Sequence, residues 1–231
     1  MTSLTTRPKA RAWVGGTVLA ATLTTVLIGW SLAAPPGASP DDGYHLASIW
    51  CAEGFKEGRC LEDPGAPDLS RVLIPFSAPA LVCFQQDGQR SAACAIDEQS
   101  SNLQVFSQVK DSNIRRERPN LYYLAMHQLI GEDFAASVAR MRGANILLAV
   151  LMVTLTALIA AAPLRRAFLL TTVLTSVPLG LFLVTSLNTS AWGLIGLTTL
   201  WANALTALED GRRRHRLAAT VLALLGVVLA L

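Results

Sequence analysis

Long stretches without a charged side chain constrain this chain more than any other feature of its sequence. Residues 12–34, 143–164, 167–208 and 217–231 contain no Asp, Glu, Lys or Arg. A helix needs roughly 20 apolar residues to cross the ~30 Å hydrocarbon core of a bilayer. The stretch 167–208 is long enough for two crossings and contains a polar turn at 186–190. The sequence therefore predicts an all-α polytopic membrane protein with five transmembrane helices, at residues 12–34, 144–162, 167–185, 191–208 and 217–231.

The composition agrees with this class and argues against others. Charged residues make up 15% of the chain, against about 25% in soluble domains. The formal net charge of +3 is too small for a nucleic-acid-binding surface, so no nucleic acid is expected as a partner. Transporters usually have ionisable residues within their spans. These spans have none, so transport by this chain alone is not expected. The fifth span has only 15 residues, which predicts that the chain is a fragment of a longer membrane protein.

Basic residues near the span ends predict the orientation, because cytoplasmic loops carry an excess of Lys and Arg. If the nine basic residues near the span ends are cytoplasmic, the N-terminus at 1–11 is cytoplasmic too. Residues 144–231 then form a truncated bundle of transmembrane helices two to five. Residues 35–143, with 10 basic and 14 acidic side chains, then form one extracytoplasmic loop. The expected location is the cytoplasmic (inner) membrane of a bacterium. The basic residues are Arg7, Lys9, Arg11, Arg165, Arg166, Arg212, Arg213, Arg214 and Arg216.

Span one could also be a cleaved signal peptide, because small residues at 31–34 resemble a cleavage site. Its apolar region is about 22 residues long, however, whereas the apolar region of a signal peptide has about 7–15. We therefore expect span one to remain as an anchor.

All four cysteines lie in the predicted extracytoplasmic loop, where oxidation is the default. Four cysteines allow three pairings. A small β-hairpin with its tip in the Asp-Gly-Gln-Arg sequence between Cys83 and Cys94 places these two opposite each other. By elimination, Cys51 pairs with Cys60. A metal site is the weaker interpretation, because there is no Cys-x-x-Cys pair and no histidine at zinc-ligand spacing.

A short juxtamembrane helix is predicted at residues 41–52, just after span one. Ser39 is a suitable N-cap, Pro40 a suitable first helical residue, and Asp42 the N3 partner of a capping box. His45 then shares a helix face with Asp41 and Asp42. These two carboxylates and the imidazole are candidate catalytic residues at the water–lipid boundary. The alternative is that the acidic residues only stabilise the helix dipole.

Two further groups of side chains are candidates for binding. Tyr122 and Tyr123 open an apolar stretch and could contact a substrate, although tyrosines near a membrane more often form an interfacial belt. His127, in the same stretch, is expected to be a packed or interfacial histidine. Arg140 and Arg142 precede the second span on the side opposite the positive-inside bias. A guanidinium there can bind a phosphate bidentately or extend to lipid headgroups.

Three sequence elements carry a resemblance to a known family. They are Pro40-Asp-Asp-Gly-Tyr-His45, Pro119-Asn-Leu-Tyr-Tyr123 with an arginine ahead of the second span, and the stretch 177–193. The chain resembles the membrane-embedded GT-C glycosyltransferases, and more closely the bacterial predicted-membrane-protein family called domain of unknown function 2142. The resemblance covers nearly the whole chain and about the N-terminal half of a full-length member. Two positions depart from the family pattern, Asp42 where Glu is commoner and Thr189 where Pro is expected.

The resemblance implies an inverting transfer of a sugar from a polyprenyl-phosphate donor to an envelope glycan acceptor outside the cytoplasm. Asp41 or Asp42 would act as general base, with His45 as orienting residue or phosphate partner. Arg140 and Arg142 would neutralise the departing phosphate. Some GT-C enzymes use a divalent cation and others do not, and the aspartate pair leaves both open. The competing hypothesis is a non-catalytic membrane subunit of envelope polysaccharide assembly or export.

Overall fold

The computed structural model describes residues 8–36, 38–39, 41–64, 72–74, 89–91, 105–107, 120–209 and 211–231. The chain divides into two compact units, which are described separately. The helical unit comprises residues 1–30, 144–185 and 190–231, and the disulfide unit comprises residues 31–143 and 186–189. Helices α1 and α7 each contribute residues to both units.

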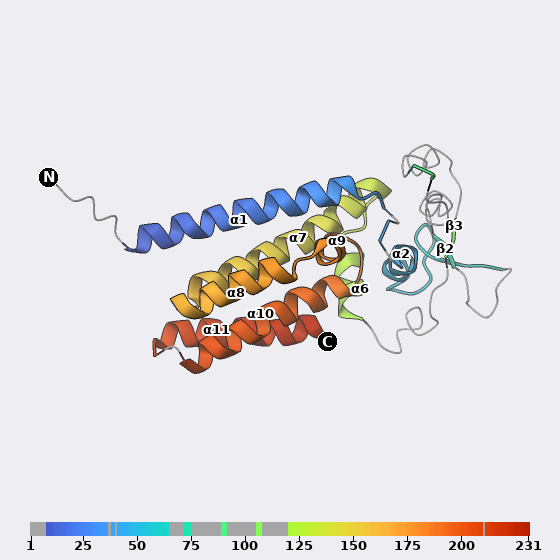
Figure 1. Ribbon diagram of the computed structural model, residues 1–231. Helices are drawn as coiled ribbons and strands as arrows, with labels where there is room; N and C mark the ends of the chain where they lie inside the picture. Colours follow the sequence, from blue (N-terminus) through green and yellow to red (C-terminus); the bar gives the residue numbers. More distant parts are fainter. Residues whose placement is uncertain are drawn as a thin grey trace. The chain divides into compact units, whose positions relative to one another are not determined.

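The helical unit is built from long helices that lie side by side (Figure 1). Three helices in the described part of the chain are long and apolar enough to cross a membrane, namely Val14–Ala33 within α1, α7 and α10. A fourth crossing is possible if α8 and α9 count as one span. The helix bounds are α1 Pro8–Ala33, α7 Phe134–Ile159, α8 Ala162–Thr175, α9 Pro178–Thr185, α10 Ser190–Glu209 and α11 Arg213–Ala230.

The segment predicted as the third span is two helices, α8 and α9, bent by 91°. Pro178 is the first residue of α9. Its ring disfavours the helical conformation for Val177 and removes a backbone donor, so the preceding helix must end. The predicted polar turn at 186–190 does separate α9 from α10.

Apolar side chains from α1, α7, α10 and α11 form the main core of the helical unit. Leu27, Met152, Ile195 and Leu229 are among its buried members. Large apolar side chains on the outer helix faces are exposed, as expected for helices surrounded by lipid. Burial inside the bundle and exposure outside it therefore agree with a membrane protein.

Polar side chains link the helices inside this core. Trp192 Nε1 donates to Asn145 Oδ1 at 3.1 Å, and Asn203 Nδ2 donates to Thr156 Oγ1 at 2.8 Å. Both bonds join α7 to α10, and Asn145, Asn203 and Thr156 are fully buried. Interhelical hydrogen bonds of this kind contribute roughly 0.6–2 kcal/mol each in membranes. They fix the axial register of α10 on α7.

The described part of the disulfide unit contains two short helices, α2 Asp42–Trp50 and α6 Leu121–His127, and a three-stranded antiparallel sheet. The strands are β1 Leu61–Glu62, β2 Val72–Ile74 and β3 Val105–Ser107. In the register, Leu61 pairs with Leu73, and Leu73 pairs with Phe106. Val72 and Ile74 are buried, and β2 and β3 both contact α2.

Several sequence predictions have an outcome here. The helical membrane architecture and the Cys51–Cys60 disulfide are confirmed. The second span begins earlier than predicted, since α7 starts at Phe134. The predicted hairpin strands and the Cys83–Cys94 pair lie outside the described residues. The fifth span is not confirmed, because α11 has three arginines among its first four residues.

Candidate functional site

Helix α2, Asp42–Trp50, lies within the predicted range 41–52 and begins one residue later than predicted. Asp41 occupies the N-cap position with φ 61°, the left-handed region, and its side chain makes no capping bond. The backbone N–H of Asp42 donates to Ser39 O at 3.1 Å, and that of His45 donates to Asp41 O at 2.9 Å. Ser39 therefore lies in the turn before the helix, and Asp42 is at the first helical position. The prediction of Ser39 as the N-cap is wrong, because the turn at Ser39 precedes a helix whose N-cap is Asp41. Pro40 itself lies outside the described residues.

Asp42 is buried beside an arginine from α7. Its Oδ2 lies 3.9 Å from Arg142 Nη2, and the two side chains are only 1% and 7% exposed. Arg142 Nη1 also donates to Ser31 O at 3.1 Å and Ala34 O at 2.6 Å, and Nη2 donates to Pro35 O at 3.2 Å. These carbonyls belong to the end of α1 and the turn after it, where a cation is favoured by the helix dipole. Arg142 thus joins the end of α1 to the start of α2.

His45 faces α6, where its Nδ1 lies 2.8 Å from the hydroxyl of Tyr123. Burial lowers the pKa of His45, while Asp41 acts in the opposite direction, so the imidazole is neutral near pH 7. Burial also raises the pKa of Tyr123 above its usual value, and Tyr44 adds to this effect. The hydroxyl of Tyr123 therefore keeps its proton, which it can donate to the neutral imidazole.

The two tyrosines proposed to contact a substrate are both buried in the disulfide unit. Tyr122 is 3% exposed and Tyr123 is 6% exposed, and their ring centroids are 5.9 Å apart. Asn120 caps this helix, because its Oδ1 accepts a bond from Tyr122 N at 2.9 Å. The tyrosines therefore pack α6 on its surroundings in this structure.

Arg140 is exposed and lies apart from these contacts. Its Nε donates to Leu129 O at 3.0 Å, and its Nη2 donates to Ser137 Oγ at 3.1 Å. A side chain at Gly131 would collide with this guanidinium, so Arg140 lies directly against the turn between α6 and α7. Of the two predicted phosphate-binding arginines, Arg140 is thus the one that solvent or a ligand can reach.

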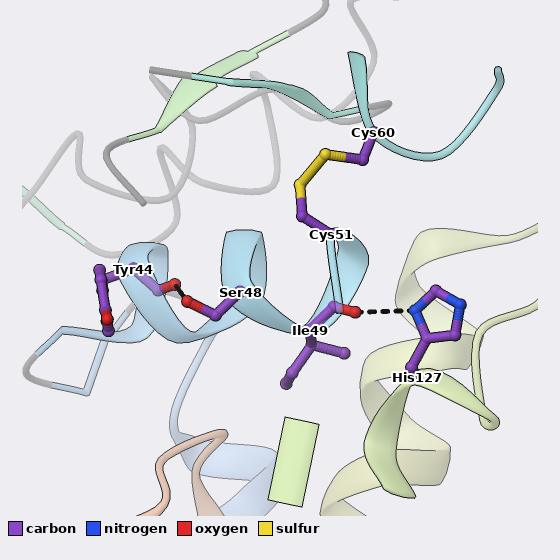
Figure 2. Close-up of a disulfide and its surroundings, with 6 residues drawn as sticks. All are labelled: Tyr44, Ser48, Ile49, Cys51, Cys60 and His127. Atoms are coloured by element: carbon purple, nitrogen blue, oxygen red, sulfur yellow. Dashed lines mark hydrogen bonds between the residues drawn. A yellow bond between two sulfur atoms is a disulfide. The ribbon is translucent and has the colours of Figure 1, made fainter. Parts of the chain in front are cut away.

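The disulfide joins the residue after α2 to the end of a short loop. Cys51 and Cys60 are both fully buried, and Figure 2 shows their bond beside α2 and the hydrogen bond from His127 Nδ1 to Ile49 O, at 2.8 Å. His127 is only 2% exposed. The expectation of a packed histidine is therefore confirmed.

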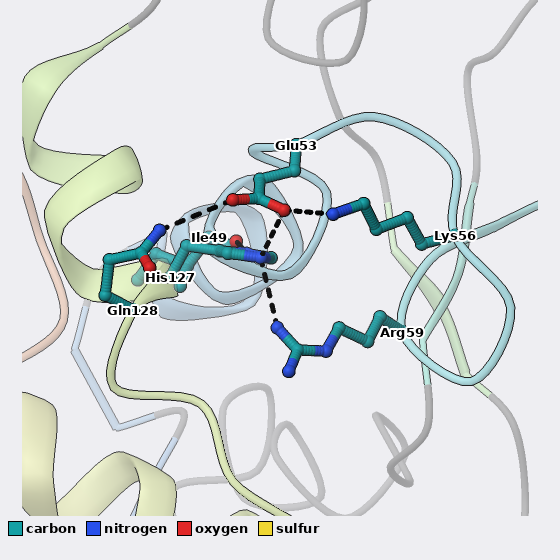
Figure 3. Close-up of polar contacts among 6 residues, drawn as sticks. All are labelled: Ile49, Glu53, Lys56, Arg59, His127 and Gln128. Carbon is teal, nitrogen blue, oxygen red and sulfur yellow. Dashed lines mark hydrogen bonds and ion pairs between the residues drawn. The ribbon is translucent and has the colours of Figure 1, made fainter.

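The loop closed by the disulfide carries a polar cluster that sequence reasoning missed. Figure 3 shows Glu53 between Lys56 and Gln128, with the Gln128 Nε2 to Glu53 Oε1 distance at 3.4 Å. Arg59 Nη1 lies 3.2 Å from His127 Nε2. The same Nε2 lies 3.5 Å from Glu53 Oε2. The hydrogen bond from Lys56, more than that from Gln128, lowers the pKa of Glu53 to about 2.

The sequence contained a partial signal for this cluster. The eight residues between the two cysteines include Glu53, Lys56, Glu57 and Arg59, an unusual charge density for so short a loop. Their partner His127 is 68 residues from Arg59, so only the tertiary structure brings them together. No group of three or more His, Cys, Asp or Glu side chains that could hold a metal occurs among the described residues.

The described fold and its apolar outer faces define a helical, polytopic membrane protein with a disulfide-bonded unit. The chain matches the family model described as "Predicted membrane protein (DUF2142)" over residues 24–231, and it belongs to this family. That description names no activity. No curated protein and no solved structure matches the chain.

Proposed function

We propose that this protein is a membrane-embedded glycosyltransferase, or the N-terminal part of one. It would transfer a sugar from a polyprenyl-phosphate donor to an envelope glycan acceptor outside the cytoplasm. The observation that supports this most is the environment of Asp41, which is exposed and directly precedes α2. Its left-handed backbone is uncommon for a residue other than glycine, and such conformations concentrate at functional sites.

The burial of the neighbouring residues suggests a division of roles between the two aspartates. Asp42 is buried and next to Arg142, so it is proposed as a support for the start of α2. Asp41 is open to solvent and acts electrostatically on His45, so it is proposed as the base that deprotonates the acceptor hydroxyl. His45 would orient this carboxylate while Tyr123 holds its ring. A base in hydrogen-bond reach contributes roughly 10²–10⁴-fold in rate.

The exposed guanidinium of Arg140 is the better candidate for the donor phosphate. Arg142 already faces Asp42 and three carbonyl groups, which leaves it little capacity for a ligand. Arg140 makes two hydrogen bonds to neutral groups. A phosphate could replace these with stronger charge-assisted bonds.

The proposed reaction also requires the disulfide unit to face away from the cytoplasm. We propose five spans with the N-terminus inside, as the basic residues indicate. The α8–α9 pair would be a broken third span and α11 the fifth span. The Cys51–Cys60 disulfide supports this orientation, because disulfides persist in oxidising compartments.

The test is transfer of radiolabelled sugar from a polyprenyl-phosphate donor in membranes that contain the full-length protein. The change Asp41→Asn removes the base, and Asn tolerates the left-handed backbone at this position. We expect at least a hundred-fold loss of transfer with normal membrane insertion. The matched control is Glu62→Gln, an exposed carboxylate on β1 that should leave transfer unchanged. Full transfer by the Asp41→Asn, Asp42→Asn double variant would refute the proposal.

One observation favours a second candidate, a non-catalytic membrane subunit of envelope polysaccharide assembly or export. Asp42, His45, Tyr123 and Arg142 are all buried and contact one another or the backbone, as structural residues do. On this alternative, the double aspartate variant would lose stability and keep the amount of polysaccharide exported per folded molecule.

A further inference from the structure

A pocket in the disulfide unit lies beside the polar cluster around His127 and shares only Arg59 with it. None of its lining residues has a catalytic or phosphate-binding role in the proposed function. Its volume is about 370 Å³, within the usual range for small-molecule sites. One wall is Glu57, Gly58 and Arg59 of the disulfide loop, and the other consists of Ile130, Gly131, Glu132 and Phe134. Trp50, at the end of α2, also lines the pocket.

The first wall is held in place by covalent and polar contacts. The Cys51–Cys60 bond closes the loop, and Lys56 N donates to Cys60 O at 2.8 Å. The guanidinium of Arg59 is held by His127, whose Nε2 lies 3.2 Å from Arg59 Nη1 (Figure 3). His127 is in turn fixed by Ile49 O at 2.8 Å. A preformed wall of this kind reduces the ordering cost of binding a ligand.

The second wall is also fixed by hydrogen bonds. The N–H of Gly131 donates to Ser137 Oγ at 2.9 Å, and Arg140 Nε donates to Leu129 O at 3.0 Å. The aromatic rings of Trp50 and Phe134 contact each other, with centroids 5.6 Å apart at 46°. Both walls are therefore ordered by contacts within the protein.

The chemistry of the lining selects among ligand classes. Glu57 and Glu132 supply two carboxylates and Arg59 one guanidinium, so the local charge disfavours an anion such as a phosphate. The guanidinium disfavours a cation. A neutral molecule with many hydroxyl groups can donate to both carboxylates and accept from Arg59. The partly exposed ring of Phe134, which packs on the buried indole of Trp50, offers an apolar surface for the C–H face of a sugar ring.

We infer that this pocket binds a neutral saccharide. That a saccharide binds follows from the pocket alone, and its identity as the glycan acceptor rests on the proposed function. Glu57 and Glu132 then accept hydrogen bonds from sugar hydroxyls, and Arg59 donates to a ring or hydroxyl oxygen.

The test measures binding of maltose, cellobiose, α-1,6-mannobiose, galactobiose and digalacturonate to the full chain in lipid nanodiscs. Saturation-transfer NMR detects binding, and titration gives Kd. We expect saturable binding of at least one neutral disaccharide, weaker binding of the acidic one, and a roughly ten-fold or greater rise in Kd for Glu132→Gln and for Arg59→Gln. The matched controls are Glu62→Gln and Arg90→Gln, exposed residues of the same unit that do not line the pocket.

Because Arg59 also supports His127, Glu57→Gln provides a further pocket variant at an exposed position, and the same rise in Kd is expected. No binding by any neutral disaccharide, preference for digalacturonate, or equal Kd values in pocket and control variants would each overturn the inference. The measurement needs no donor and no transfer. Binding with no loss of transfer in Asp41→Asn would refute the proposed function and leave the saccharide site intact.

Discussion

Removing the guanidinium of Arg142 should destabilise the protein strongly. In the change Arg142→Met, the buried carboxylate of Asp42 loses the cation 3.9 Å away, and three carbonyl oxygens at the end of α1 lose their donor. Breaking one side of a buried ion pair costs about 3–5 kcal/mol. We expect a loss of this size in the free energy of unfolding, because both side chains are less than a tenth exposed.

Arg140→Met is the matched control two residues away on the same helix. Arg140 is exposed and donates only to Leu129 O and Ser137 Oγ, so its loss should cost about 1 kcal/mol. Asp42→Asn in the Arg142→Met background should restore part of the stability, because it removes the uncompensated charge. Tryptophan fluorescence during denaturation in detergent micelles measures all three. Equal stability of the Arg142 and Arg140 variants, with weaker donor binding only in the former, would refute the structural role and support phosphate binding by Arg142.

Three further outcomes are expected. Gly196→Ala should lower the melting temperature, because the new Cβ would lie 2.5 Å from a backbone oxygen of α11. Overpacking of this kind costs about 1–3 kcal/mol. The control Gly193→Ala, on the same helix, places its Cβ more than 4 Å from any neighbour and should leave the melting temperature unchanged. Replacing Cys51 and Cys60 with serine should cost about 2.5 kcal/mol for so short a loop, measured by thermal unfolding. With a folded-state pKa of about 2, lowered from 4.5, the Glu53 carboxylate should contribute stability above pH 4.5 that is lost as the pH falls toward 2. The Glu53→Gln variant should lose less stability over that interval, and an identical pH profile would contradict this assignment.

The sequence predicted the bounds of a helix well where charged or polar residues lie at both of its ends. The predicted span 191–208 is α10, Ser190–Glu209. The predicted second span begins ten residues after the start of α7, because Arg140 and Arg142 are charged and the prediction rests on uncharged stretches. The helix continues through Arg140 and Arg142 because both guanidinium groups find acceptors in the disulfide unit. Such partners are distant in sequence, so local composition could not reveal them.

The candidate site was predicted in part. Sequence reasoning named Asp42, His45, Tyr123 and Arg142, and the structure brings Asp42 to Arg142 and His45 to Tyr123. It did not reveal that these residues are buried, because burial depends on how α2 and α6 pack. The break at Pro178, by contrast, had a local signal that the charge-based prediction of the span did not use.

Labelling of single added cysteines in intact cells measures which side of the membrane the disulfide unit faces. Glu132 in that unit and Gly211 between α10 and α11 are both exposed positions. The proposed orientation predicts that a membrane-impermeant maleimide labels Glu132→Cys in intact cells and labels Gly211→Cys only after permeabilisation, with the parent chain as background. Labelling of Gly211→Cys but not Glu132→Cys would place the disulfide, the proposed base and the saccharide pocket in the cytoplasm, and would contradict transfer to an extracytoplasmic acceptor.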